Sequence, residues 1–246
     1  MASLSQRVAV ISDVHGNGHA LEAVLASIDA EEPDELWCLG DLVGYGPQPN
    51  ECCAVVAARA DLCLAGNHDL VVLGSLDLYD FAGDAATAAR WTQTVLAEAA
   101  RTFLAALEST AVRDGVELFH GSPRDPVWDY VLSQEAAWST FQATSSPLVL
   151  VGHSHIPLAI RLGDDDLTGG VAGDGAEIDL GSGRWLLNPG SVGQPRDGDP
   201  RAAYLLVEPG SSASFRRVSY PVAQTQAEMR ERGLPAALAE RLAHGV

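Results

Sequence analysis

Lysine is absent from the sequence, because all 15 basic residues are arginines. This absence excludes a P-loop lysine and a Schiff-base lysine, together with the nucleotide contacts and covalent chemistry that depend on them. Basic residues are also scarce, since 33 acidic residues leave a formal net charge of −18. Such a chain has no polybasic surface for nucleic acid or for an anionic membrane, and we expect neither as a partner.

Cysteines and long apolar runs are few as well. The apolar run at residues 8–11 is too short for a secretion signal, and no run reaches the roughly eighteen residues of a membrane span. The cysteines lie in the first quarter of the chain and show neither a CxxC spacing nor a spread suited to a disulfide framework (Cys38, Cys52, Cys53 and Cys63). We therefore expect free thiols in a cytoplasmic protein.

The remaining composition is typical of a globular protein, with 47% apolar and 20% charged residues. No linker and no fixed-period repeat divides the sequence, so we predict a single domain over residues 1–246.

The periodicity of apolar residues predicts an α/β fold. Strands expected at 8–11, 35–39 and 62–65 alternate with helices at 19–30 and 51–60, which indicates parallel βαβ units in a layered domain. Beyond these units, we expect a helix at 85–107, a hairpin over 111–119 and strands at 148–151, 157–162, 203–207 and 214–220. The Gly- and Asp-rich segment 163–184 indicates antiparallel hairpins, and 224–243 a closing helix.

Five of the predicted strands end in the same way, with an apolar run followed by Gly or Asp and then by polar residues. The segments are VAVISDVHG (8–16), LWCLGDLVG (36–44), LCLAGNHD (62–69), VELFHGSPRD (116–125) and LVLVGHSH (148–155). Sites in open α/β sheets form beyond the carboxyl ends of the strands. We therefore expect Asp, His and Asn side chains to meet in one pocket.

The residue types in these loops favour a metal site. Asp13 and His15 are two residues apart, as are His153 and His155, so each pair can point to one side of an extended loop. The two oxygens of Asp41 can bridge two cations. Ligands of this kind without cysteine favour manganese, iron or zinc over a thiolate site. Any one of the loop histidines could equally be a capping or core residue, but five together favour ligation (His15, His68, His120, His153 and His155).

The order of these motifs resembles that of the calcineurin-like metallophosphoesterases. The matching elements are Asp13-x-His15, Gly40-Asp41, Gly66-Asn67-His68-Asp69, His120 and Gly152-His153-Ser154-His155. The stretches 40–51 and 120–125 are most similar to the small prokaryotic phosphodiesterase branch. The protein phosphatase branch carries an Arg where this chain has Leu42 to Tyr45, so protein phosphomonoesters are not the expected substrate. The resemblance implies a layered β-sheet sandwich flanked by helices, with mixed parallel and antiparallel strands.

The resemblance also implies roles for individual residues. One divalent cation would be held by Asp13, His15, Asp41 and His155, and a second by Asp41, Asn67, His120 and His153. Manganese is the favoured metal, with iron, zinc and nickel as alternatives. The implied reaction is hydrolysis of small phosphate esters, nucleotides among them, by a hydroxide that bridges the metals. His68 would act as the general acid and Asp69 would orient or polarise its imidazole.

Several alternatives stay open at this point. Arg124 contacts substrate phosphate or forms an ion pair with Asp125 or Asp129, and Asn67 is a second candidate for substrate contact. Arg196 is a weaker candidate than Arg124. The chain could also be a non-catalytic scaffold on the same fold, or a nuclease. The preference between diesters and monoesters, and assembly into a homo-oligomer, are left open.

Overall fold

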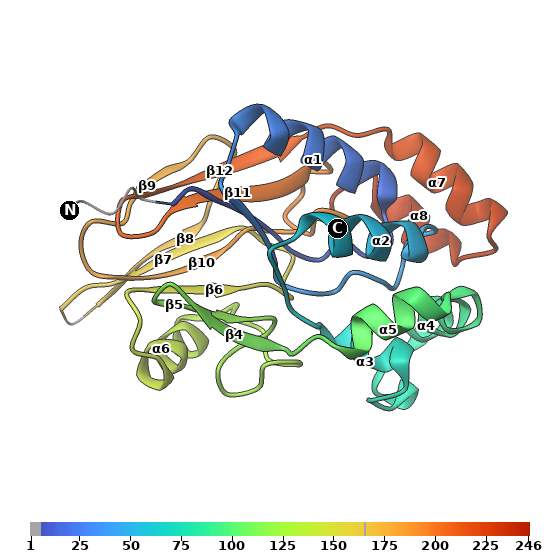
Figure 1. Cartoon of the computed structure of the whole chain (residues 1–246), viewed down its shortest axis with the longest axis horizontal. Coiled ribbons are helices and arrows are strands. Elements are labelled where there is room, and N and C mark those ends of the chain that lie inside the picture. The colour runs from blue at the N-terminus through green and yellow to red at the C-terminus, as the bar shows by residue number, and fades with distance from the viewer. Residues whose placement is uncertain (1–5, 165) are drawn as a thin grey trace.

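The computed structural model describes residues 6–164 and 166–246, and two β-sheets packed face to face form its centre (Figure 1). In the described residues each sheet has six strands. The first has the order β3 (Leu62–Cys63), β2 (Glu35–Cys38), β1 (Val8–Ile11), β11 (Ala202–Glu208), β12 (Ser212–Val218) and β9 (Glu177–Asp179). The second has the order β4 (Thr110–Arg113), β5 (Val116–Phe119), β6 (Leu148–Val151), β10 (Arg184–Asn188), β7 (Leu158–Leu162) and β8 (Leu167–Val171).

Both sheets mix parallel and antiparallel pairs, which confirms the expected fold class. β1, β2 and β3 are mutually parallel in the first sheet, and β5, β6 and β10 are parallel in the second. The outer strands pair antiparallel, as in the β4–β5 hairpin and the β11–β12 ribbon. The carboxyl ends of the parallel strands therefore open toward the same end of the sandwich.

Helices cover the two outer faces of the sandwich and one of its ends. α1 packs on β11 and β12, whereas α6 packs on β10 of the other sheet (Figure 1). The helices are α1 (Gly18–Glu31), α2 (Pro49–Arg59), α3 (Asn67–Leu73), α4 (Gly83–Val95), α5 (Glu98–Ala105), α6 (Gln134–Ala143), α7 (Val222–Glu231) and α8 (Ala236–Arg241). None of the helices in the described ranges is both long and apolar enough to cross a lipid bilayer.

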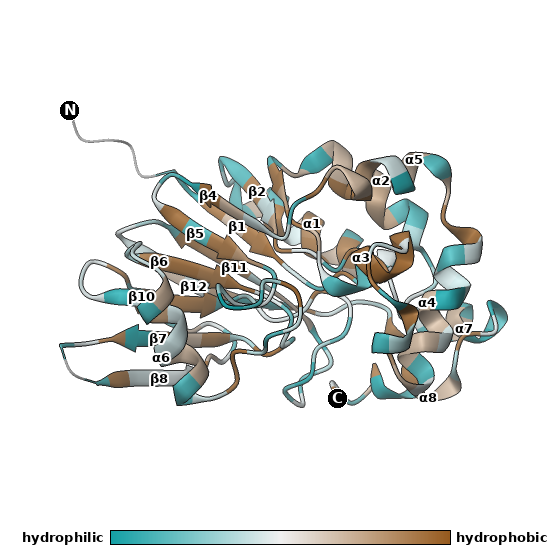
Figure 2. Cartoon of the chain, turned by 90° about the horizontal axis from the view of Figure 1, so that it is seen from below, coloured by the Kyte–Doolittle hydropathy of each residue, from teal (hydrophilic) through white to brown (hydrophobic). Residues whose placement is uncertain are grey.

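Strand alternation explains why both faces of the first sheet are buried. Val8 and Val10 point into the core between the two sheets, while Ala9 and Ile11 point to the core beneath the helices. Figure 2 shows the resulting concentration of apolar residues along the strands. Because side chains alternate across a strand, a run such as 8–11 must be apolar throughout to fill two cores at once.

Two predicted long helices are each split in two, so these predictions were wrong in extent. Residues 85–107 form α4 and α5, and the break is held by Asn50, whose amide donates to Val95 O and accepts from Ala97 N at 2.9 and 2.8 Å. Residues 224–243 fall in α7 and α8, separated by Gly233 in the left-handed region and by Pro235. Proline lacks the N–H that a continuous helix needs.

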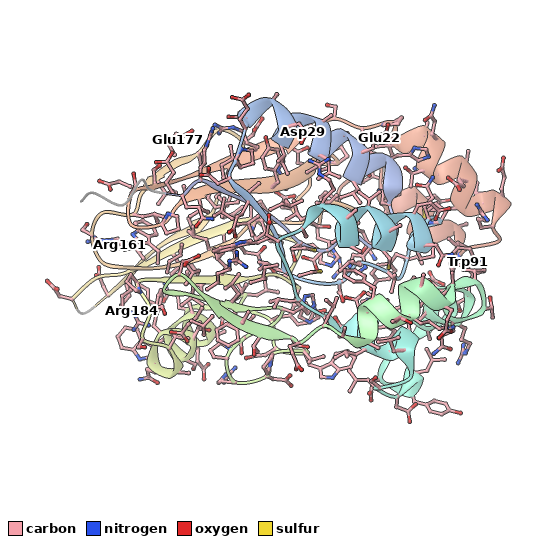
Figure 3. The ribbon with its side chains drawn as sticks, viewed as in Figure 1. Glu22, Asp29, Trp91, Arg161, Glu177 and Arg184 are labelled. Atoms are coloured by element: carbon pink, nitrogen blue, oxygen red, sulfur yellow. The ribbon has the colours of Figure 1, made fainter. Side chains whose placement is uncertain are left out.

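The segment 163–184 joins the sheets instead of forming one antiparallel edge. β8 pairs with β7 in the second sheet, but β9 crosses over and pairs with β12 in the first. The strand β10 and the helix α6 were not predicted. Arg184 of β10 donates to the carbonyls of Phe141 and Thr144 at the end of α6, both at 2.8 Å, and lies beside that helix in Figure 3.

Candidate metal centre

The loops that follow β1, β2, β3, β5 and β6 meet at one edge of the sandwich, as the repeated strand endings predict. Their side chains form two groups of candidate ligand atoms, and the atoms in each group lie within 4.8 Å of one another. Asp41 belongs to both groups. The first group is Asp13, His15, Asp41 and His155, and the second is Asp41, His120 and His153. Asn67 Oδ1 lies beside the second group, 3.3 Å from His120 Nε2.

The backbone at these positions is strained. The φ angles of Asp13, His15, Asp41, His153 and His155 lie between 49° and 62°, in the left-handed region. Residues other than glycine adopt this region rarely, at a cost of order 1–3 kcal/mol each. Strain concentrated on one set of buried side chains indicates that the fold holds them in place for a function.

The histidine rings of the first group are held so that two ring nitrogens face each other. His15 Nδ1 lies 3.1 Å from Val43 O, and His155 Nδ1 lies 2.6 Å from Gln194 O. A carbonyl oxygen can only accept, so both Nδ1 atoms carry the hydrogen and both Nε2 atoms present lone pairs. Those two Nε2 atoms are 3.1 Å apart. Two lone pairs at this distance repel unless a cation lies between them.

The second group repeats this arrangement. His120 Nδ1 lies 2.8 Å from Leu39 O, so in the neutral ring Nε2 presents the lone pair. This Nε2 faces Asn67 Oδ1 at 3.3 Å, His153 Nδ1 at 3.2 Å and Asp41 Oδ2 at 3.4 Å.

Several carboxylate oxygens of the two groups are also buried acceptors. Both oxygens of Asp13 and Oδ2 of Asp41 are buried without a hydrogen-bond partner among the described residues. Buried acceptors of this kind are stable only when a positive charge compensates them. The donor set therefore fits divalent cations in both groups.

Protons supply part of this charge in the metal-free protein. Burial alone would lower the pKa of His120, but the carboxylates of Asp41 and Asp13 and the hydrogen bond to Leu39 O together outweigh burial and raise that pKa to about 9. Burial likewise acts to raise the pKa of Asp41, yet the imidazoles of His120 and His68 hold it well below its usual range. For Asp13, burial raises the carboxyl pKa to about 7.

Glycines allow the loops to approach closely. A Cβ atom on Gly66 would lie 2.0 Å from Asp41 Oδ1, and one on Gly40 would lie 2.7 Å from Gly66 N. Gly66 therefore leaves the space that the bridging candidate Asp41 occupies, and Asp41 Oδ1 accepts from His68 N at 2.9 Å.

The segment 188–194 forms hydrogen bonds with the loops that carry the candidate ligands. Asn188 donates to Gly152 O at 2.7 Å, and Ser191 Oγ donates to Asp13 O at 2.8 Å. Gln194 supplies the carbonyl that orients His155. The signal in the sequence is the Asn188-Pro189-Gly190-Ser191 turn, which its proline and glycine make stiff.

The buried His68 ring borders the first ligand group. Its ring centroid is 4.7 Å from that of His15 and 4.4 Å from those of Tyr45 and Phe81. Burial lowers the pKa of His68 to about 4, so the ring is neutral near pH 7 in the absence of substrate.

The expected contact between Asp69 and the His68 imidazole is wrong. Asp69 Oδ1 accepts from the amides of Leu42 and Val43 at 2.9 and 3.1 Å, and Oδ2 accepts from Gly66 N at 2.9 Å. At the start of α3, this carboxylate satisfies backbone donors that have no partner within the helix. Asp69 therefore ties the loop of Asp41 to the loop of Asn67.

The structure favours Arg196 over Arg124 as a candidate for contact with phosphate, the reverse of the preference from the sequence. Arg124 is half-exposed and pairs with Asp129 at 2.7 Å, so the ion-pair alternative holds in this structure. Arg196 has no carboxylate within 4.0 Å among the described residues. Its Cζ lies 5.8 Å from the centroid of the Tyr45 ring, and its positive charge acts to lower the pKa of His68.

Two further aromatic contacts lie beside the centre. The Tyr130 ring stacks on His153 with 3.9 Å between centroids and 19° between planes. The Phe81 ring packs edge-on against Trp128 at 5.7 Å.

Comparisons with known proteins agree with this geometry. The model of the calcineurin-like phosphoesterase superfamily domain matches residues 7–211. An uncharacterised protein of Methanocaldococcus jannaschii is 36% identical over 242 residues, which cover 96% of each chain. The crystal structure of a metallophosphoesterase from Sphaerobacter thermophilus superposes with a TM-score of 0.87 at 44% identity, covering 98% of this chain and 100% of that one. A symmetrical bis(5'-nucleosyl)-tetraphosphatase of Erwinia tasmaniensis is 39% identical over 67 residues, or 26% of this chain and 24% of that protein.

Metal binding is expected to release protons. At pH 7.5 the metal-free protein carries a proton on His120, with its pKa of about 9, and a fraction of one on Asp13, with its pKa of about 7. Ligands must be deprotonated to bind, so about one proton should leave on metal binding. Affinity should therefore rise as the pH increases from about 7 to about 9. Calorimetric titrations in two buffers of different ionisation enthalpy measure this release, and identical heats in both would contradict it.

Replacement of Gly66 by alanine should disturb Asp41. The added Cβ would lie 2.0 Å from Asp41 Oδ1, so the carboxylate or its loop must move. We expect a loss of about 1–3 kcal/mol in stability, the usual cost of overpacking, and weaker metal binding. Gly170→Ala is the control, because a Cβ there meets no atom within 4 Å. Urea unfolding and metal titration of both variants test this, and equal metal affinity in the two would refute it.

Proposed function

The chain belongs to the calcineurin-like phosphoesterase superfamily, and from this premise we propose that it is a dinuclear, metal-dependent hydrolase of small phosphate esters. The observation that carries the proposal is the pair of buried acceptor groups that share Asp41. A bridging carboxylate between two ligand sets is the arrangement that two adjacent cations require.

The proposed ligands divide between two cations. Asp13, His15, Asp41 and His155 would hold the first, and Asp41, Asn67, His120 and His153 the second. When bound, such a pair lowers the pKa of a water molecule and neutralises charge on the phosphate. Manganese suits this mixture of imidazole, carboxylate and amide ligands, and iron, zinc or nickel would also fit it.

His68 is proposed to donate a proton to the leaving oxygen. Its ring borders His15 of the first group and packs against the rings of Tyr45 and Phe81, so it would lie close to a phosphate bound at that group. The pKa of about 4 describes the ring before substrate binds. A phosphate anion beside the ring favours the protonated form, which brings the proton where the leaving oxygen needs it.

Arg196, and not Arg124, is proposed to contact a phosphate oxygen. Arg196 lies over Tyr45 and its guanidinium donates to Gln194 Oε1 at 2.8 Å, without a competing carboxylate in the described part of the chain. Arg124 would first have to leave Asp129. An unpaired guanidinium at the rim can bind phosphate through two parallel hydrogen bonds.

The proposed substrates are small phosphorylated molecules, with nucleotides as the leading class. The aromatic rim of Tyr45, Phe81 and Tyr130 provides surfaces on which a base or another ring can stack. The short match to a symmetrical bis(5'-nucleosyl)-tetraphosphatase agrees with this class. The net charge of −18 does not favour the nuclease alternative, because duplex DNA would be repelled.

Substitution of His68 tests the proposed function. The metal-stripped protein, reloaded with Mn²⁺, should hydrolyse bis(p-nitrophenyl) phosphate. His68→Asn should still bind two ions per chain, yet on an alkyl ester, whose leaving oxygen needs a proton, lose roughly 10²–10⁴-fold in kcat, the usual contribution of a general acid. The loss should grow as the leaving group becomes a poorer one.

His19→Asn is the matched control, since His19 lies outside the centre, 3.4 Å from Glu228. An equal loss for good and poor leaving groups would remove the role of His68 as an acid. Absence of hydrolysis by the reloaded wild-type protein would favour the scaffold alternative.

A further inference from the structure

Three of the four candidate histidine ligands are oriented in the same way, and His153 is not. In His15, His120 and His155 the nitrogen turned away from the ligand group lies 3.1, 2.8 and 2.6 Å from a backbone carbonyl oxygen. His153 turns Nδ1 toward the second group, and its Nε2 is buried without a hydrogen-bond partner among the described residues. Histidines that bind metal almost always donate a hydrogen bond from that other nitrogen. Another contact is therefore needed to orient the His153 ring.

Tyr130 supplies such a contact. Its ring stacks on the His153 ring with 3.9 Å between centroids and 19° between planes. The imidazole is 3% exposed and the tyrosine 44%, so the phenol ring covers His153 on one side and meets solvent with the rest of its surface. Nearly parallel rings at this distance restrict the tilting of the imidazole. The stack thus restrains a ring that lacks the carbonyl partner of the other three.

The stack should become more favourable when a cation binds. The face of a phenol ring carries a partial negative charge and attracts a positively polarised partner. The imidazole becomes such a partner when its Nδ1 binds a divalent cation. Tyr130 would therefore stabilise the metal-bound form of His153 more than the metal-free form. Only a difference of this kind raises affinity, because a contact equally good in both forms shifts no equilibrium.

The loop that carries Tyr130 also supplies a ligand to the same group. This loop leads from β5 to α6 (Figure 1) and begins with His120, whose Nε2 lies 3.2 Å from His153 Nδ1. Gly121 lets the loop fold back closely, since a Cβ atom there would lie 2.7 Å from Asp125 O. One loop therefore reaches both histidines of the second group, one as a ligand and the other through the stack.

The two neighbours of Tyr130 in the chain are anchored. Asp129 Oδ2 accepts from Ser122 Oγ at 2.6 Å and from the Arg124 guanidinium at 2.7 Å. Val131 is buried in an apolar cluster with residues of α6 and β6. The ion pair of Arg124 thus holds the residue that precedes Tyr130. The stretch 120–125 thereby shapes the loop that presents the ring to His153.

We propose that Tyr130 is a positioning residue of the metal centre, whose ring orients His153 and raises the affinity of the second group for a divalent cation. The second group is the set of Asp41, Asn67, His120 and His153. The inference rests on the ligand assignment of the proposed function, but it does not depend on hydrolysis.

Removal of the ring tests the proposal. Wild type and Tyr130→Leu, both stripped of metal, are titrated with Mn²⁺ in a calorimeter, which gives two dissociation constants per chain. In Tyr130→Leu one constant should rise about tenfold, the lower end of the usual effect of removing a residue that orients a ligand. The other constant should stay unchanged. Thermal unfolding of the metal-free proteins shows that the variant is folded.

Anomalous scattering assigns the weakened site. Crystals of wild type and Tyr130→Leu are soaked at the same Mn²⁺ concentration, chosen between the two dissociation constants of the variant. Occupancy in Tyr130→Leu should fall at the second group and stay unchanged at the first group. A fall at the first group, or an equal fall at both, would overturn the proposal.

Two further variants separate the ring from other causes. Burial raises the pKa of the Tyr130 hydroxyl, and the positive charge of Arg196 opposes this rise, so the hydroxyl has surroundings of its own. Tyr130→Phe removes the hydroxyl and keeps the ring, and it should bind both ions as wild type does. Tyr79→Leu is the matched control, because the Tyr79 side chain is 90% exposed, and it should also keep both constants.

Failure of this inference differs from failure of the proposed function. Wild-type constants in Tyr130→Leu would remove the role of Tyr130, as would a loss in Tyr130→Phe equal to that in Tyr130→Leu. Two ions bound without hydrolysis of any phosphate ester would refute the proposed function alone. A wild-type protein that binds fewer than two ions would refute both.

Discussion

Lone pairs that face one another inside the protein impose the main electrostatic constraint on this structure. The Nε2 atoms of His15 and His155 are 3.1 Å apart, and in the neutral rings neither carries the hydrogen, because each Nδ1 donates its own to a carbonyl. Around Asp41 the same conflict involves carboxylate, amide and imidazole groups. A protein interior does not tolerate uncompensated acceptors. Positive charge must enter, from protons in the metal-free state or from cations.

Both sheets supply residues to this unfavourable arrangement of acceptors, and the packing of the sheets keeps these residues together. The first sheet supplies Asp13, His15 and Asp41, and the second supplies His120, His153 and His155. The apolar core between the sheets, with Val10, Leu118 and Leu150 among its members, stabilises the sandwich and thereby keeps the two sets together. Backbone carbonyls of Leu39, Val43 and Gln194 fix the rings, so the ligand geometry does not depend on exposed or mobile partners.

Aromatic rings and an arginine lie together beside the centre. His68, Tyr45, Phe81 and Arg196 gather on one side, where an aromatic wall and an unpaired guanidinium meet. Within a chain of net charge −18, a guanidinium without a carboxylate partner among the described residues offers an anion a contact that the acidic surface does not. This contrast supports the proposal that the substrate is a small anion.

The sequence by itself determined the repeated strand endings and, through them, the edge at which the polar residues meet. Local periodicity is sufficient for this, because the carboxyl ends of parallel strands lie on one side of a sheet. The partners of Asp69, Arg124 and Arg196 were decided only by the tertiary structure, as was the break that Asn50 holds between α4 and α5. For Arg196 and Asn50 these contacts join residues far apart in the chain. Hydrogen bonds and ion pairs of that kind depend on how the sheets and helices pack, and no local pattern encodes that packing.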